Sequence, residues 1–139
     1  SLVNKSVLQN DVTVVSIFIN PTQFNNIDDL KTYPSDIDKD LELLKSISDK
    51  IIVFNPDPNE LYSGDIRLDQ FNFNGLDKHM EGEFREDHFV GVATVVSKFF
   101  SLINADYAYF GEKDFQQLRI IENLIKSLIL KFISCDKKR

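Results

Sequence analysis

Residues 106–121 read DYAYFGEKDFQQLRII, and within them the hydrophobic pattern changes from that of a strand to that of a helix. The apolar run 107–110 has strand length, and Gly111 ends it. After the glycine, apolar residues recur at helical spacing, at Leu118, Ile121, Ile125 and Leu128. A strand that turns through glycine into a helix leaves backbone N–H groups unpaired at the helix start, where anions bind. We therefore predict a ligand site at this junction, because open α/β sheets bind ligands at the carboxyl ends of their strands.

Polar side chains gather at the same junction. Lys113 and Asp114 lie at the turn, and Gln116 and Gln117 follow within the first helical turn. Charge, amide groups and backbone donors therefore converge at one strand end, which favours an anionic ligand. The alternative is an ordinary strand–helix junction in which Asp114 only caps the helix.

The rest of the chain alternates strands and helices in the same way. Strands are expected over 11–20, 50–55 and 130–134, and helices over 2–8, 35–48 and 89–103. The polar stretch 23–33 is expected to be a surface loop with one helical turn, and Ser35 is the expected N-cap of the helix after it. Alternating β and α elements predict an α/β fold with a doubly wound parallel sheet.

Two apolar patterns add detail to this fold. Residues 12–19 are almost continuously apolar and rich in β-branched side chains, which predicts a strand covered on both faces in a parallel sheet. Residues 66–73 alternate between apolar and polar with one slip, which predicts a further strand with a bulge. The strand–helix–strand order over 11–55 predicts a βαβ unit with a right-handed crossover.

Length and composition restrict the class of protein. The 139 residues suffice for one domain, and the net charge of −6 argues against broad nucleic-acid binding. No apolar run approaches ~18 residues, so no membrane span is expected, and the first residues lack a signal-peptide layout. The only cysteine, Cys135, cannot form a disulfide within the chain and fits a reducing compartment. We therefore expect a cytoplasmic protein without a membrane or nucleic-acid partner.

A second polar group follows the first strand, at Asn20-Pro-Thr-Gln-Phe24. The proline fixes the turn, while Asn20 and Gln23 offer amide donors and acceptors at the carboxyl edge of the sheet. The alternative is that Asn20 only satisfies the backbone groups of the turn.

A third group precedes the valine-rich helix. Arg85 and His88 lie beside the helix start, and Gly91 allows another backbone or a ligand to approach closely. The alternatives are a solvated arginine and a structural histidine. No cluster of Cys, His or carboxylate residues has metal-ligand spacing, so we expect no metal held by the protein. The P-loop and the Gly-x-Gly-x-x-Gly motif are both absent.

Four motifs occur in one order along the chain. They are Asn20-Pro-Thr-Gln-Phe24, Tyr33-Pro34, His88-Phe-x-Gly-Val-x-Thr-Val-Val96 and Tyr109-Phe-Gly-Glu-Lys-Asp-x-Gln-Gln-Leu118. Together they closely resemble the family of pantothenate synthetases (pantoate–β-alanine ligases), and the resemblance covers residues 1–136. It implies a Rossmann-like fold of the HIGH nucleotidyltransferase superfamily.

The resemblance also implies a reaction. Members join pantoate to β-alanine at the expense of ATP, through pantoyl adenylate, and form a precursor of coenzyme A. Mg²⁺ would be carried by the ATP phosphates, as small hard cations often are. Neither step needs a protein nucleophile, so the site must align two anions and neutralise charge that develops on phosphate. Family members are commonly homodimers, and we expect the same here.

The family's site residues transfer onto matching positions. For pantoate, the resemblance implies that Gln23 and Gln117 hold the hydroxyl and carboxylate oxygens. Asn20 lies next to them, and Val95 and Val96 form the apolar wall for the gem-dimethyl group.

For ATP, the resemblance implies that Lys113 meets the phosphates as the catalytic cation, a role suited to a compact point charge. Gly111 and Asp114 lie near the ribose. Arg85 and His88 match residues near the β-alanine carboxylate.

The chain departs from the family pattern at both ends. The family's His-x-Gly-His strand, its Ser-Ser-Arg loop and its small C-terminal domain have no counterpart in residues 1–139. The resemblance therefore implies a partial domain, truncated at both ends, with an exposed apolar sheet edge, no ligase activity alone and a tendency to self-associate. Two alternatives remain: another adenylyltransferase of the superfamily, which would lack the paired glutamines, and a non-catalytic module that acts in binding or assembly.

Overall fold

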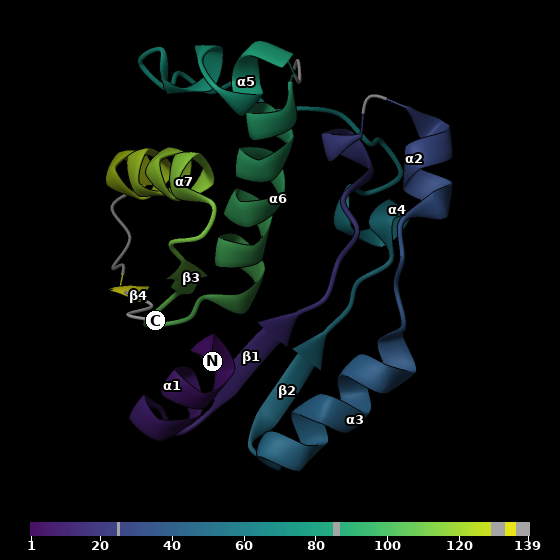
Figure 1. Ribbon diagram of the computed structural model, residues 1–139, viewed down its shortest axis with the longest axis vertical. Coiled ribbons are helices and arrows are strands. Elements are labelled where there is room, and N and C mark those ends of the chain that lie inside the picture. Colours follow the sequence, from purple (N-terminus) through teal and green to yellow (C-terminus); the bar gives the residue numbers. More distant parts are fainter. Residues whose placement is uncertain (25, 85–86, 129–132, 136–139) are drawn as a thin grey trace.

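The computed structural model describes residues 1–24, 26–84, 87–128 and 133–135. Within these ranges the chain alternates short strands with helices (Figure 1). The elements are α1 (Leu2–Gln9), β1 (Thr13–Ser16), the 3₁₀ helix η1 (Pro21–Gln23), α2 (Ile27–Thr32), α3 (Ile37–Ile47), β2 (Ile51–Phe54), α4 (Pro58–Leu61), the 3₁₀ helix η2 (Leu76–Lys78), α5 (Glu81–Phe84), α6 (His88–Ile103), β3 (Tyr109–Gly111), α7 (Phe115–Leu128) and β4 (Ile133–Cys135).

The strands form two parallel pairs. β1 pairs with β2, and α3 lies in the connection between them; Thr13 is opposite Ile51. β3 pairs with β4, and α7 lies in their connection; Tyr109 is opposite Ile133. The strand–helix–strand order predicted over 11–55 is therefore confirmed, and β3, α7 and β4 follow the same order. The predicted continuous sheet is present there as two separate two-stranded sheets, because no described strand hydrogen-bonds to both pairs.

Helix α1 connects the two strand pairs. It packs against both β1 and β3. The Ser6 hydroxyl lies 3.0 Å from the Thr13 hydroxyl of β1. The Tyr109 hydroxyl of β3 accepts a 2.8 Å hydrogen bond from Asn10 and donates one of 2.9 Å to Gln9. The first ten residues therefore contact both halves of the α/β frame.

Helix α6 lies between η1 and α7 (Figure 1), and most of its first two turns are buried. One side, with Phe89 and Ala93, packs against α7 and Phe73. The other side, with Val95, packs against Leu61 and Tyr62. A helix that is apolar nearly all round is expected in an interior position, so the prediction of a helix over 89–103 is confirmed and its place is explained.

The prediction that the first strand is covered on both faces is wrong for the described structure. β1 is shorter than the predicted 11–20, and Val12 and Val14 have exposed fractions of 55% and 37%. Ile52, the register partner of Val14, is 56% exposed. Continuous apolarity reflects a preference for burial, but the described residues place nothing over this face.

Residues 66–73 form no strand, contrary to the prediction. The segment runs along α6 in irregular conformation, and the Asp69 backbone N–H donates a 3.1 Å hydrogen bond to the Thr94 hydroxyl. Phe71 and Phe73 stack with ring centroids 5.8 Å apart, and Phe73 is buried. The alternation of apolar and polar residues over 66–73 therefore reflects the packing of aromatic side chains on the core, and the segment has no partner strand in the described structure.

Two helix boundaries also differ from prediction. Asp36, not Ser35, caps α3, and its carboxylate accepts a 3.1 Å hydrogen bond from the Lys39 N–H. The stretch 23–33 contains a six-residue helix, α2, capped by Asn26, where the sequence predicts only one turn. Both Asn and Asp are strong N-caps, which explains both starts.

Candidate functional site

Two of the three predicted polar groups lie on junctions that flank α6. One is η1, which follows β1 and packs against α6; the other is the β3–α7 junction. In Figure 1, η1 and α7 lie on opposite sides of α6. Asn20 and Gln23 therefore belong to the first junction, and Gly111, Lys113 and Gln117 to the second.

Asn20 is held by the protein on all sides. Its side chain is 3% exposed, and its Nδ2 donates a 2.9 Å hydrogen bond to the Gly91 carbonyl of α6. Its Oδ1 accepts hydrogen bonds from the Tyr62 hydroxyl at 2.7 Å, the Thr22 hydroxyl at 2.8 Å and the Thr22 N–H at 3.2 Å. The amide therefore caps η1, as the structural alternative describes, and also ties η1 to two distant elements.

Gly91 marks the closest approach of η1 to α6. A Cβ at this position would lie 2.7 Å from the Thr22 carbonyl oxygen and 2.9 Å from the Thr22 hydroxyl. Only glycine allows this contact without a shift of the backbone. The prediction that Gly91 permits close approach of another backbone is confirmed.

The two valines differ in their surroundings. Val95 is 5% exposed and packs with Leu61 and Tyr62, whereas Val96 is half-buried and contacts both core clusters. Gln23 is half-buried, and its backbone N–H donates a 3.2 Å hydrogen bond to the Asn20 carbonyl. The amide of Gln23 thus lies on a segment that packs directly on the helix of the two valines.

The β3–α7 junction presents the predicted cation to solvent. Lys113 and Asp114 are exposed, and the Asp114 carbonyl accepts the first main-chain hydrogen bond of α7, from the Leu118 N–H at 3.0 Å. Gly111 ends β3 and is half-buried. The strand-to-helix turn is therefore confirmed in its predicted place.

The adjacent glutamines have different environments. The Gln116 Nε2 donates hydrogen bonds to the carbonyls of Leu76, at 2.8 Å, and His79, at 2.6 Å, and so ties α7 to η2. Gln117 is half-buried on the next position of the helix. Gln116 thus has a structural task in the described structure, which leaves Gln117 as the candidate for ligand contact.

Of the predicted β-alanine residues, one is described. His88 begins α6, is 7% exposed and lies edge-on to the ring of Phe89, with centroids 5.0 Å apart. Arg85 lies outside the described residues.

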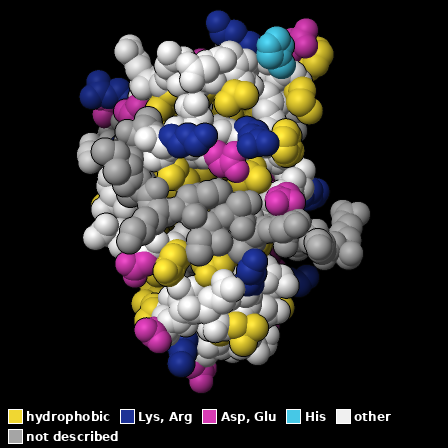
Figure 2. Space-filling view, turned by 90° about the vertical axis from the view of Figure 1, so that its left-hand side faces the viewer, with side chains coloured by type: hydrophobic (Ala, Val, Ile, Leu, Met, Phe, Trp, Pro, Cys, Tyr) yellow, Lys and Arg dark blue, Asp and Glu magenta, His cyan; other side chains and the backbone are white. Residues whose placement is uncertain are grey.

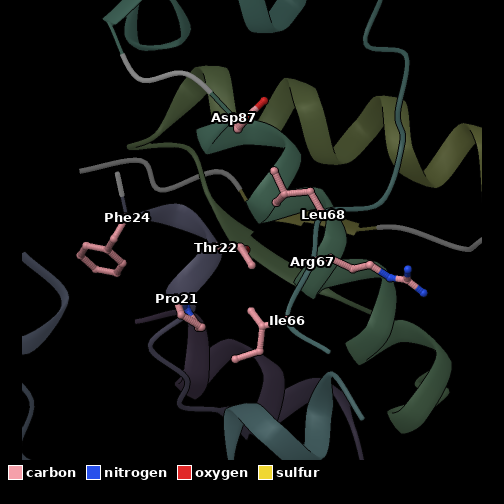
Figure 3. Close-up of a pocket in the computed structure, with 7 residues that line it drawn as sticks. All are labelled: Pro21, Thr22, Phe24, Ile66, Arg67, Leu68 and Asp87. Atoms are coloured by element: carbon pink, nitrogen blue, oxygen red, sulfur yellow. The ribbon is translucent and has the colours of Figure 1, made fainter. Parts of the chain in front are cut away.

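A cavity of about 560 Å³ lies between η1 and the irregular segment 66–68 (Figure 3). Its lining consists of Pro21, Thr22, Phe24, Ile66, Arg67, Leu68 and Asp87. In Figure 3 the Arg67 guanidinium extends away from Thr22 and Ile66; its Nε lies 3.3 Å from an Asp65 carboxylate oxygen. The sequence analysis did not identify residues 66–68 as part of a cavity lining, because the alternation of apolar residues there predicts a strand.

Burial raises the pKa of the Tyr62 hydroxyl above its ordinary value, and the charge of Asp69 acts in the same direction. Hydrogen bonds to Thr22 and Asn20 oppose this shift without cancelling it. Tyr62 is therefore neutral at ordinary pH and available as a hydrogen-bond donor.

On the face that carries α7, positive, negative and apolar side chains are interspersed (Figure 2). Among the described helices, none combines the length and apolarity needed to cross a bilayer. Within the described ranges, no three His, Cys, Asp or Glu side chains gather as a metal site would require.

Comparison with known proteins gives the family. The family model for pantoate-beta-alanine ligase matches residues 1–137. The pantothenate synthetase of Flavobacterium psychrophilum is 46% identical over 137 residues, which cover 97% of this chain and 49% of that protein. The enzyme of the same name from Christiangramia forsetii is 50% identical over 137 residues, or 97% of this chain and 48% of that protein.

Solved structures give the same result. The pantoate-beta-alanine ligase of Francisella tularensis, complexed with beta-gamma ATP and beta-alanine, superposes with a TM-score of 0.89 at 37% identity, covering 99% of this chain and 53% of that chain. Pantothenate synthetase from Thermus thermophilus gives 0.87 at 34% identity, covering 96% and 49%. The chain thus spans about half the length of the relatives it matches, and it has their Rossmann-like α/β fold. With the family model matching nearly every residue, the chain belongs to the pantoate–β-alanine ligase family.

Proposed function

We propose that the chain supplies the pantoate site and one side of the ATP site of an ATP-dependent ligase that makes pantothenate from pantoate and β-alanine. The observation that carries this proposal is the attachment of η1 to α6 at Gly91. This attachment holds η1, which contains Gln23, against α6, which contains Val95 and Val96. An amide and an apolar surface therefore belong to one packed unit. Pantoate, with its polar oxygens and its gem-dimethyl group, requires both kinds of surface.

In the proposed first step, a pantoate carboxylate oxygen attacks the α-phosphorus of ATP, and pyrophosphate leaves. In the second, the β-alanine amine attacks the acyl carbon of pantoyl adenylate, and AMP leaves with the bonding electron pair. Gln23 and Gln117 donate to pantoate oxygens, and Asn20 keeps Gln23 in place beside them. Alignment of this kind converts a bimolecular reaction into an effectively unimolecular one.

For ATP, we assign Lys113 to the phosphates and Gly111 and Asp114 to the ribose region. The exposure of Lys113 at a strand-to-helix turn supports this assignment, because such turns also present backbone N–H groups to anions. Mg²⁺ would accompany the ATP phosphates. Arg85 and His88 are assigned to the β-alanine carboxylate. The solved relative from Francisella tularensis, complexed with beta-gamma ATP and beta-alanine, supports these substrate classes.

We further propose that residues 1–139 form a partial nucleotide- and pantoate-binding domain of a cytoplasmic homodimer. Complete turnover would need the His-x-Gly-His strand and the C-terminal domain. The separation of the described strands into two pairs and the coverage of half of each relative support this proposal.

Calorimetry with pantoate and with ATP tests the proposed function. We expect the chain to bind pantoate and Gln117→Ala to abolish that binding. Gln116→Ala is the matched control, because Gln116 already bonds the carbonyls of Leu76 and His79; this variant should lose stability and keep pantoate affinity. Binding of ATP alone would limit this chain to the ATP side of the site, and binding of neither ligand would favour a non-catalytic module.

A further inference from the structure

We infer that Tyr62 is a positioning residue for the pantoate site, because its hydroxyl acts through Asn20 to hold η1 against α6. This inference rests on the proposed function, since it concerns the shape of the site that carries Gln23. Tyr62 belongs to none of the four sequence motifs.

The first link is the hydrogen bond from Tyr62 to Asn20. Tyr62 follows α4 and is 4% exposed. Its hydroxyl donates to the Asn20 Oδ1 at 2.7 Å and lies 3.3 Å from the Thr22 hydroxyl. A buried hydroxyl with two polar neighbours on η1 defines the orientation of that turn more strongly than an exposed one would.

The second link runs from Asn20 to α6 and to Gln23. The same amide that accepts from Tyr62 donates through Nδ2 to the Gly91 carbonyl at 2.9 Å. The Asn20 carbonyl accepts from the Gln23 N–H at 3.2 Å. The Asn20 side chain thus bonds to α6 and the Asn20 backbone bonds to Gln23, so this one residue connects Gln23 to α6.

The third link is the tyrosine ring. The ring packs with Leu61 and Val95 in one core cluster, and Val95 is a proposed wall of the pantoate site. Tyr62 thus contacts the apolar wall through its ring and the amide side through its hydroxyl. One side chain sets the spacing between the two surfaces that pantoate would need.

The test is Tyr62→Phe, which removes the hydroxyl and keeps the ring in the core. We expect pantoate to bind about fivefold to tenfold more weakly, the effect of one lost hydrogen bond, while the ATP dissociation constant changes less than twofold. The matched control is Tyr109→Phe, which removes a hydroxyl bonded to Asn10 and Gln9. This control should lower the melting temperature by a similar amount and leave pantoate affinity unchanged.

Equal pantoate affinity in Tyr62→Phe and the parent chain would overturn the inference, and so would an equal loss in Tyr109→Phe. Failure of the parent chain to bind pantoate would instead refute the proposed function for this chain. In that case, amide NMR judges the positioning role by itself. The Thr22 and Gln23 signals should shift and exchange faster in Tyr62→Phe but not in Tyr109→Phe, and unchanged signals would contradict the inference.

Discussion

Replacement of Gly91 by alanine tests the tight contact between η1 and α6. The new Cβ would lie 2.7 Å from the Thr22 carbonyl oxygen, about 0.7 Å inside the 3.4 Å at which ordinary contact begins. The nearest atom, the Thr22 carbonyl oxygen, belongs to the backbone, so a side-chain rotation cannot relieve this contact. The 3₁₀ helix η1 must therefore move away from α6, and the 2.9 Å hydrogen bond from the Asn20 amide to the Gly91 carbonyl lengthens or breaks.

Two opposing terms decide the sign of the stability change. Alanine in a helix interior gains up to about 1 kcal/mol over glycine. Overpacking a tight contact costs about 1–3 kcal/mol, and the weakened hydrogen bond adds about 1 kcal/mol. The net result is a loss of about 1–3 kcal/mol, which lowers the melting temperature by roughly 3–10 °C in a domain of this size.

Thermal unfolding followed by circular dichroism measures this change, and calorimetry measures the accompanying loss of pantoate affinity. Ser101→Ala is the matched control, because Ser101 is exposed on the same helix and gains helix propensity without a clash; its stability should rise by up to about 0.5 kcal/mol. A Gly91→Ala variant that melts at or above the temperature of the parent chain would refute the reasoning, because helix propensity alone predicts that outcome.

Three further perturbations address other features. Lys113→Ala should weaken ATP binding at least tenfold in calorimetry and change the free energy of unfolding by less than about 0.5 kcal/mol, because the side chain is exposed; unchanged ATP affinity would remove Lys113 from the site. The raised pKa of Tyr62 favours its neutral form in the folded state, so its contribution to stability is complete below its ordinary value of 10.0 and is lost as pH rises through the higher folded value. Above about pH 10, the melting temperature of Tyr62→Phe should therefore fall less steeply with pH than that of the parent chain. Parallel curves of melting temperature against pH for the two proteins would contradict this. Finally, Ile52→Lys places a charge on the exposed face that Ile52 shares with Val14, so self-association in sedimentation velocity should decrease, whereas an unchanged distribution would exclude this face.

The long periodic segments were predictable because their pattern admits one interpretation. Helix α6 and the β3–α7 junction lie where the spacing of apolar residues places them. The strand predicted over residues 66–73 is absent, because an alternating pattern indicates which side chains avoid water but not which element they pack against. Phe71 and Phe73 avoid water by packing on each other and on the core. Likewise, Ser35 and Asp36 are adjacent cap formers, and only the backbone geometry selects Asp36.

The site was predictable by residue type but not by partner. The sequence indicated that Asn20 and Gly91 matter, and the structure adds that they bond to each other. Nothing local to the sequence points to Tyr62, which lies 42 residues from Asn20 along the chain and outside every motif. Gln116 and Gln117 are the same residue type at adjacent positions. Their different directions on α7 bring only the Gln116 amide to the carbonyls of Leu76 and His79.

Helix α1 has a consequence for cooperativity. The β1–β2 pair and the β3–β4 pair share no described ladder hydrogen bond, yet α1 contacts both. Hydrogen bonds from α1 and the residue after it reach Thr13 in one pair and Tyr109 in the other. Helix α6 also couples the two halves, because it packs against η1 and α7. We therefore expect local opening of α1 to weaken the coupling between the pairs, whereas an intact α1 strengthens it. Residues 1–10 therefore help determine whether the α/β frame unfolds in one step or in two.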